Sequence, residues 1–242
     1  MSVPERIEKM KAINKAIIDS YFVVDQNVKL LTPLLEDESV YSKWDYSEGV
    51  QGVNAIRLAL YKHILSDIRA IMFDSSSKNT ASVQTIIPAL KDSAFIKGIK
   101  DSFCISLGVS ILGDHTEEEI ERLTKSFQEE DVQRKSDIFD KTLSEVLSTF
   151  YELKSSELGR RIDAARSRMI SHKEITTVEN ERVLFDASHF DLTFGDAKKM
   201  VTLSQDIIFD INLLLTNSSY SLDSFIGYHE TVAKEFWGKL NA

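Results

Sequence analysis

Glycine and proline are scarce in this chain, with 9 glycines and 3 prolines among 242 residues; their usual combined share in soluble domains is roughly 12%. Because tight turns depend on these two residues, such a chain contains few turns and few short strands. The composition therefore favours long helices. Cysteine is nearly absent as well. The single Cys104 excludes an intrachain disulfide, which fits a reducing compartment and leads us to expect a cytoplasmic location.

Long apolar runs are also missing. The most apolar stretch, DIIFDINLLL, contains two aspartates, whereas a membrane-spanning helix needs about 18 or more apolar residues. The opening sequence MSVPERIEKMK alternates charges and lacks the apolar centre of a signal peptide. The formal net charge of −9 argues against unspecific coating of nucleic acid. We therefore expect neither a membrane nor DNA as a partner.

Apolar residues recur at spacings of three and four along most of the chain, which is the period of an amphipathic helix. The pattern predicts a short helix between 80 and 90 and long helices over about 4–31, 53–74, 195–216 and 221–239, with a helical stretch over 116–170 that is continuous or broken once. Residues 93–112 are expected to form a weakly amphipathic helix or two pieces broken at Gly98 or Gly108. A second apolar row, Leu58, Leu65 and Met72, predicts that helix 53–74 is central. Thr116 and Glu119 have the spacing of a capping box.

This pattern predicts a single all-α domain, an antiparallel up-and-down helical bundle of four core helices plus additional helices, with no sheet. Residues 1–49 are expected to form an N-terminal helix and loop, 50–216 the core bundle, and 217–242 a C-terminal helix. The segment 173–192 is polar, and we interpret it as a connection held to the body by nearby apolar residues. We interpret Asp67, Arg69 and Asp74 as helix-end or interhelical polar ties.

The stretch DAARSRMISHKE, residues 163–174, contrasts with the acidic chain around it. Between residues 159 and 173 five basic residues stand against one acid; the basic residues are Arg160, Arg161, Arg166, Arg168 and Lys173. One histidine, His172, lies among them. Histidine exchanges protons near neutral pH, and a guanidinium holds phosphate and stabilises charge that develops on it. Together they suffice to cleave RNA through its 2′-hydroxyl without a metal, and we expect neither a metal nor a cofactor.

The motif Arg166-Ser-Arg-Met-Ile-Ser-His172 resembles the Arg-x(4–6)-His motif of the HEPN superfamily, and its surroundings resemble the AbiU-type abortive-infection branch. The resemblance covers about 50–216. It implies a helical dimer and, in active members, a metal-independent endoribonuclease whose two motifs meet at the dimer interface. Carried onto this sequence, it makes Arg166 the phosphate-binding residue, His172 the general base or acid, and Ser167 the polar residue after the arginine. Arg168, Lys173 and Arg161 would bind substrate.

Two alternatives remain open at this stage. In an ideal helix Arg166 and His172 lie about 120° apart, whereas Arg168 and His172 share a face, so either arginine is a candidate partner of the histidine. Likewise, the basic residues fit two functions. One is a homodimeric ribonuclease, a toxin or antiphage effector restrained by an antitoxin or other regulatory protein. The other is a non-catalytic helical dimer that binds a nucleotide or a protein, with His172 half-buried at a helix end.

Overall fold

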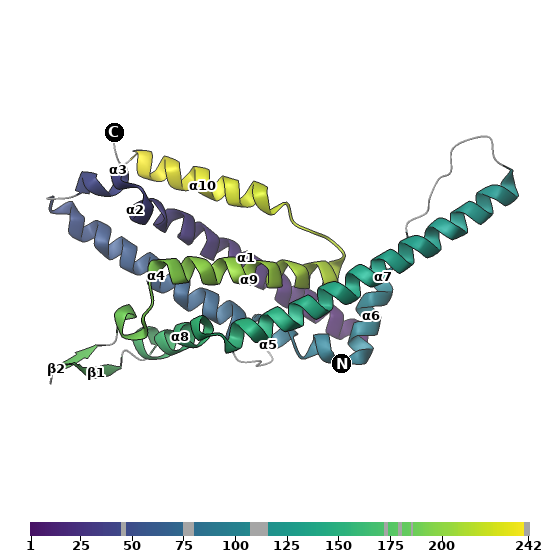
Figure 1. Cartoon of the computed structure of the whole chain (residues 1–242), viewed down its shortest axis with the longest axis horizontal. Helices are drawn as coiled ribbons and strands as arrows, with labels where there is room; N and C mark the ends of the chain where they lie inside the picture. The colour runs from purple at the N-terminus through teal and green to yellow at the C-terminus, as the bar shows by residue number, and fades with distance from the viewer. Residues whose placement is uncertain are drawn as a thin grey trace.

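The computed structural model describes residues 1–44, 47–74, 80–106, 116–171, 174–178, 181–184 and 186–239. Five long helices in this part of the chain organise the molecule: α1 (Val3–Leu31), α4 (Gly49–Phe73), α7 (Glu117–Ser155), α9 (Phe194–Thr216) and α10 (Leu222–Lys239). Successive long helices run in alternating directions, and the first half of α7 extends beyond the bundle (Figure 1). The predicted all-α antiparallel bundle is confirmed.

Shorter elements connect the long helices. Their bounds are α2 (Pro33–Glu36), α3 (Glu38–Tyr41), α5 (Val83–Ile86), α6 (Ser93–Phe103) and α8 (Glu157–Ala165), with 3₁₀ turns at Ser42–Trp44, Ala89–Lys91 and Ala187–Phe190. A π-helical segment, Arg166–Ser171, continues α8. No helix in the described part of the chain is both long and apolar enough to cross a membrane.

The core lies where α1, α4 and α9 pack against one another, with α7 on the outer side of α9. Its fully buried side chains include Ile17, Tyr21, Ile64, Ile68, Ile208 and Ile211. Leu65 and Met72 are buried in it, as predicted, but Leu58 is 48% exposed. The prediction was wrong for Leu58 because the first part of α4 is covered on one side only; between residues 51 and 60, Val53 alone is buried.

The C-terminal helix α10 is attached to α1 along its length. The buried ring of His229 bonds to the Asp25 carboxylate at 2.7 Å, and the Trp237 indole N–H donates to the Leu30 carbonyl at 2.9 Å. These buried polar contacts supply partners for groups that would otherwise be costly to bury. They fix α10 on the side of α1 shown in Figure 1.

One expectation needs correction, because the polar segment after the motif contains a small sheet. Strands β1 (Ile175–Val178) and β2 (Glu181–Leu184) pair as an antiparallel hairpin, with Ile175 opposite Leu184. The strands are only four residues long and expose apolar side chains, so neither shows the alternation by which a half-buried strand is identified from sequence. The hairpin lies at the edge of the bundle (Figure 1).

The long helix predicted for 116–170 breaks once, at Ser156. The α7 start has the predicted capping box between Thr116 and Glu119. At the break, the Ser156 hydroxyl accepts a hydrogen bond from the backbone N–H of Gly159 at 3.0 Å and caps α8. A Cβ atom on Gly159 would collide with the carbonyl oxygen of Leu153. The direction of α8, and hence the position of the motif, therefore depends on a glycine at residue 159.

Gly159→Ala is accordingly expected to lower the free energy of unfolding by about 1–3 kcal/mol, the usual cost of overpacking. Gly227→Ala is the matched control, because it lies within α10 and a Cβ there meets nothing within 4 Å. That substitution should raise the free energy of unfolding by roughly 0.5–1 kcal/mol. Urea titration followed by circular dichroism measures both changes. Equal changes of the same sign would show that Gly159 is not a special position.

Candidate functional site

The motif lies where α8 changes its helical geometry. Buried Ile162, Ala165 and Met169 anchor this part of the chain to the bundle, and α4 packs against both α8 and the π-helical segment. From Arg166 to Ser171 the backbone is π-helical, a geometry based on N–H bonds to carbonyls five residues back instead of four, although the N–H of Arg166 itself still bonds to Ile162 and Asp163. The angle estimated for an ideal α-helix therefore does not apply to this motif. Such segments are frequent at functional sites.

Arg166, the first residue of the motif, is half-buried beside the end of α4. Its side chain is 32% exposed, and its Nη2 atom lies 4.0 Å from the Asp74 carboxylate at the end of α4. Its Nε atom is buried and has no hydrogen-bond partner among the described residues. A buried donor without a partner is costly, and this Nε–H lies out of reach of solvent, so a ligand can meet the guanidinium only through the exposed part of the side chain.

A second arginine, Arg69 of α4, completes this network. Its Nε atom donates to Asp163 of α8 at 2.7 Å, and its Nη1 atom donates to Asp74. The structure thus confirms the interpretation of Arg69 and Asp74 as interhelical and helix-end ties. What the sequence did not reveal is that Asp74 lies beside Arg166 and that Arg69 joins Asp74 to Asp163. Arg69 and Asp163 are 94 positions apart, and no local signal predicts such a pair.

The other predicted site residues in the described part of the chain differ in their surroundings. Ser167 and Arg168 are exposed, and Arg168 Nε lies 3.8 Å from the Glu174 carboxylate. Arg161 donates to the Asp191 carbonyl at 2.5 Å, and its Nη2 atom lies 3.6 Å from the Asp196 carboxylate in the first turn of α9. Arg161 therefore connects α8 to the start of α9. His172 and Lys173 lie outside the described residues.

A shallow hollow of about 320 Å³ borders Asp74, and its lining also includes Asp67 and Ala70 of α4. Burial raises the pKa of the Asp67 carboxyl, an effect that the His63 imidazole partly opposes. Asp67 makes no ion pair with an arginine among the described residues, unlike Asp74, seven positions further along the same helix. The two carboxylates thus line the same hollow, but only Asp74 forms an ion pair with Arg166 of the motif.

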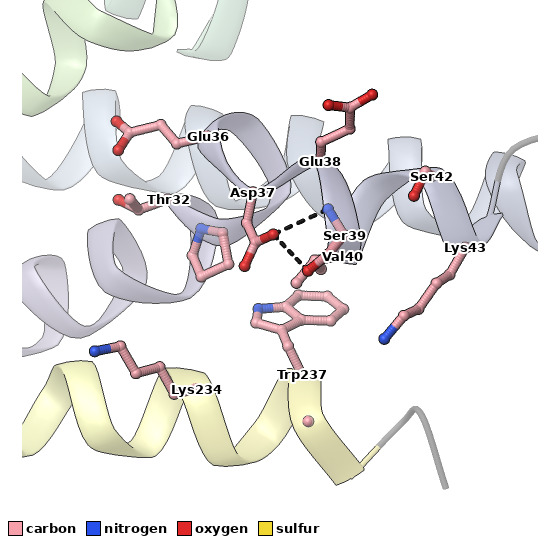
Figure 2. A pocket seen from close by; sticks show the side chains of 12 residues that line it. Thr32, Glu36, Asp37, Glu38, Ser39, Val40, Ser42, Lys43, Lys234 and Trp237 are labelled. Atoms are coloured by element: carbon pink, nitrogen blue, oxygen red, sulfur yellow. Dashed lines mark hydrogen bonds between the residues drawn. The ribbon is translucent and has the colours of Figure 1, made fainter.

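A larger hollow lies between α2, α3 and the end of α10. Its volume is about 950 Å³, and its lining comes from residues between Thr32 and Lys43 and between Lys234 and Gly238. Figure 2 shows that the Asp37 carboxylate accepts hydrogen bonds from Ser39, while the Trp237 ring lies below Val40. Its lining carries both acidic side chains, from residues 36–38, and basic ones, Lys43 and Lys234, so its charge indicates no particular ligand.

Many protein families contain helical bundles of this kind, and comparison with family models shows to which of them the chain belongs. The model of the HEPN_AbiU2 family, described as AbiU2, matches residues 7–236. The chain belongs to this family. A search of curated proteins found no match, and a search of solved structures found none either.

Membership in the HEPN_AbiU2 family reaches further along the chain than the resemblance noticed in the sequence. The match begins within α1 and ends within α10, whereas the resemblance covered about 50–216. Helix α1, which packs against both α4 and α9, is thus part of the family's domain. So is helix α10, which is attached to α1 through His229 and Asp25. Within this HEPN domain, the π-helical segment that follows α8 begins at Arg166, the first residue of the Arg-x(5)-His motif.

Proposed function

We propose that this HEPN protein is a metal-independent endoribonuclease that acts in abortive infection. The observation that carries the proposal is the position of Arg166, a partly exposed guanidinium fixed at the start of a π-helical segment, six residues before His172. In active HEPN proteins, the superfamily that this sequence resembles, an arginine and a histidine at this spacing cleave RNA. Arg166 is less exposed than Arg168, at 32% against 54%, and lies beside the end of α4, which supports Arg166 as the phosphate-binding residue.

The reaction follows from the chemistry of the two side chains. His172 takes the proton from a ribose 2′-hydroxyl, and the resulting oxygen attacks the neighbouring phosphorus. A bond from O2′ to phosphorus forms, the bond from phosphorus to O5′ breaks, and the leaving oxygen takes up a proton. Arg166 stabilises the negative charge on the pentavalent phosphorane, as positioned donors do in other acyl and phosphoryl transfers. The products are a 2′,3′-cyclic phosphate and a 5′-hydroxyl.

The remaining predicted residues have supporting roles in this proposal. Arg168 is exposed beside the phosphate-binding position and would contact the RNA backbone together with Lys173. Ser167 occupies the polar position after the arginine. The contacts of Arg161 with Asp191 and Asp196 favour a role in positioning α9, and its contact with RNA stays a prediction.

Cleavage of matched RNA and DNA oligonucleotides in excess chelator tests the proposal. RNA should be cut and DNA should resist, because DNA lacks the 2′-hydroxyl nucleophile. The chelator should leave the rate within a factor of about two, since neither proton transfer nor the arginine contact requires a metal. If purified protein leaves a broad set of RNAs intact, the non-catalytic binding module becomes the better account.

A second copy of the chain is part of the proposal, because one arginine and one histidine are a sparse catalytic set. The hairpin that follows the motif exposes 57% of Ile175 and 60% of Leu184, which lie opposite each other in the sheet. An isolated two-stranded hairpin is marginally stable in water, so a covering partner would stabilise it. We propose that the hairpin of each copy packs on the other and brings the two motifs together.

Light scattering at micromolar concentration should therefore report a dimer. Replacing both Ile175 and Leu184 with serine should weaken it, because the apolar area available for burial is lost. Tyr228→Ser is the control, since Tyr228 is 65% exposed on α10, away from the hairpin in sequence and structure. A monomer at every concentration tested, or equal dissociation in both variants, would contradict this arrangement.

A further inference from the structure

Four charged side chains from two segments of the chain meet beside the motif. They form a chain of contacts in the order Asp163, Arg69, Asp74 and Arg166. Arg69 is the most buried of them, with 17% of its side chain exposed, whereas Asp163 is 55% exposed. Arg69 holds both carboxylates through hydrogen bonds, and the Asp74 oxygen that it binds, Oδ1, is also the one nearest to Arg166.

The two contacts of Asp74 differ in kind. Its bond to Arg69 is a hydrogen bond between charged groups, a strong type of contact. Its separation of 4.0 Å from Arg166 Nη2 exceeds the usual hydrogen-bond length of roughly 2.7–3.2 Å. Asp74 therefore attracts the Arg166 guanidinium without occupying its N–H donors. The Nη groups of this partly exposed side chain can bond to phosphate oxygens, whereas its Nε–H is buried.

We infer that Asp74, held in place by Arg69, is a positioning residue for Arg166 in RNA cleavage. This inference rests on the proposed ribonuclease function. The carboxylate orients the guanidinium toward the place where negative charge develops, and it offsets the repulsion between Arg69 and Arg166. Asp163 completes the arrangement by holding the other side of Arg69.

The opposite role would be that of a competitor, in which Asp74 occupies Arg166 and must leave before phosphate binds. A competitor would have to make the contacts that phosphate later makes, and the 4.0 Å separation leaves those contacts unmade. The two roles predict different kinetics. Loss of a positioning residue lowers kcat, whereas loss of a competitor lowers KM.

The kinetic test compares Asp74→Asn with Asp67→Asn. Asparagine keeps the shape of the side chain and removes its charge. In Asp74→Asn we expect kcat for RNA cleavage to fall about 10- to 100-fold, the scale of loss from a small misplacement of a catalytic group, with KM within about twofold. Asp67 lies on the same helix and lines the same hollow but has no arginine partner among the described residues, so Asp67→Asn should leave both constants nearly unchanged.

A spectroscopic test does not depend on activity. In protein labelled with ¹⁵N at arginine, the buried Nε–H of Arg166 should give a resonance that is identified by its loss in Arg166→Lys. Asp74→Asn should shift this resonance, Asp163→Asn should shift it less, and Asp67→Asn should not shift it. Because Asp163 is exposed, its substitution should leave the fold intact. Asp163→Asn therefore still gives a result if Asp74→Asn folds poorly.

The outcomes separate the inference from the function on which it rests. An active wild-type protein whose kcat is unchanged in Asp74→Asn, or whose KM alone falls, overturns the positioning role. A wild-type protein that cleaves no RNA removes the proposed reaction. In that case the resonance decides by itself, because an Arg166 signal that is indifferent to Asp74→Asn shows that the carboxylate does not orient the guanidinium.

Discussion

Replacing His172 with alanine is expected to slow RNA cleavage by ~10²–10⁴-fold, the usual contribution of a positioned general acid or base. The imidazole is the motif's only side chain that can accept a proton near neutral pH and return it within the same turnover. Without it, the 2′-hydroxyl must lose its proton to water. The binding of RNA should change little, because the arginines that contact phosphate remain.

Single-turnover kinetics with a labelled RNA measure this change at the chemical step. His63→Ala is the matched control, since His63 is an exposed histidine of α4 outside the motif and should keep the wild-type rate. An unchanged rate in His172→Ala, or an equal loss in His63→Ala, would refute the assignment of the histidine.

Arg166→Ala should reduce the rate by roughly 10²–10³-fold, by analogy with the loss of one donor from an oxyanion hole. Arg166 is fixed near Asp74 before substrate binds, so little reorganisation is needed when charge develops on the phosphorane. Arg166→Lys should recover little of the activity, because a point charge cannot reproduce the planar array of donors of a guanidinium.

Arg168→Ala settles which arginine belongs to the motif. Arg168 is exposed, and its loss should weaken RNA binding moderately while leaving the chemical step nearly intact. If Arg168→Ala abolishes cleavage and Arg166→Ala does not, the catalytic arginine is two residues further along the chain than proposed.

The features of the fold that could be predicted from sequence are those with a local cause. The start of α7 follows from the capping box of Thr116 and Glu119, which needs no partner outside its own turn. The period of three and four residues identified the long helices because one face of each is buried in the bundle. The same argument failed for Leu58, since it assumes that a helix is covered along its whole length.

The features that could not be predicted depend on packing between distant segments. The hairpin was not predicted because its strands are four residues long and their apolar residues face solvent instead of a core. For the site, the arginine and histidine of the motif were evident, as was the polar character of Arg69 and Asp74. That Arg69 bonds to Asp163, and that Asp74 lies beside Arg166, follows from the packing of α4 against α8, which sequence spacing does not determine.

Replacement of one 2′-hydroxyl at the cleavage site tests the central claim most directly. The position of cleavage is first mapped on an RNA oligonucleotide, and the nucleotide on its 5′ side is then given a 2′-O-methyl group. In excess chelator, the unmodified RNA should yield fragments whose masses match a 2′,3′-cyclic phosphate and a 5′-hydroxyl, and the modified RNA should stay intact at that position. Continued cleavage of the modified RNA at the same bond, or fragments with a 5′-phosphate, would contradict attack by the 2′-hydroxyl.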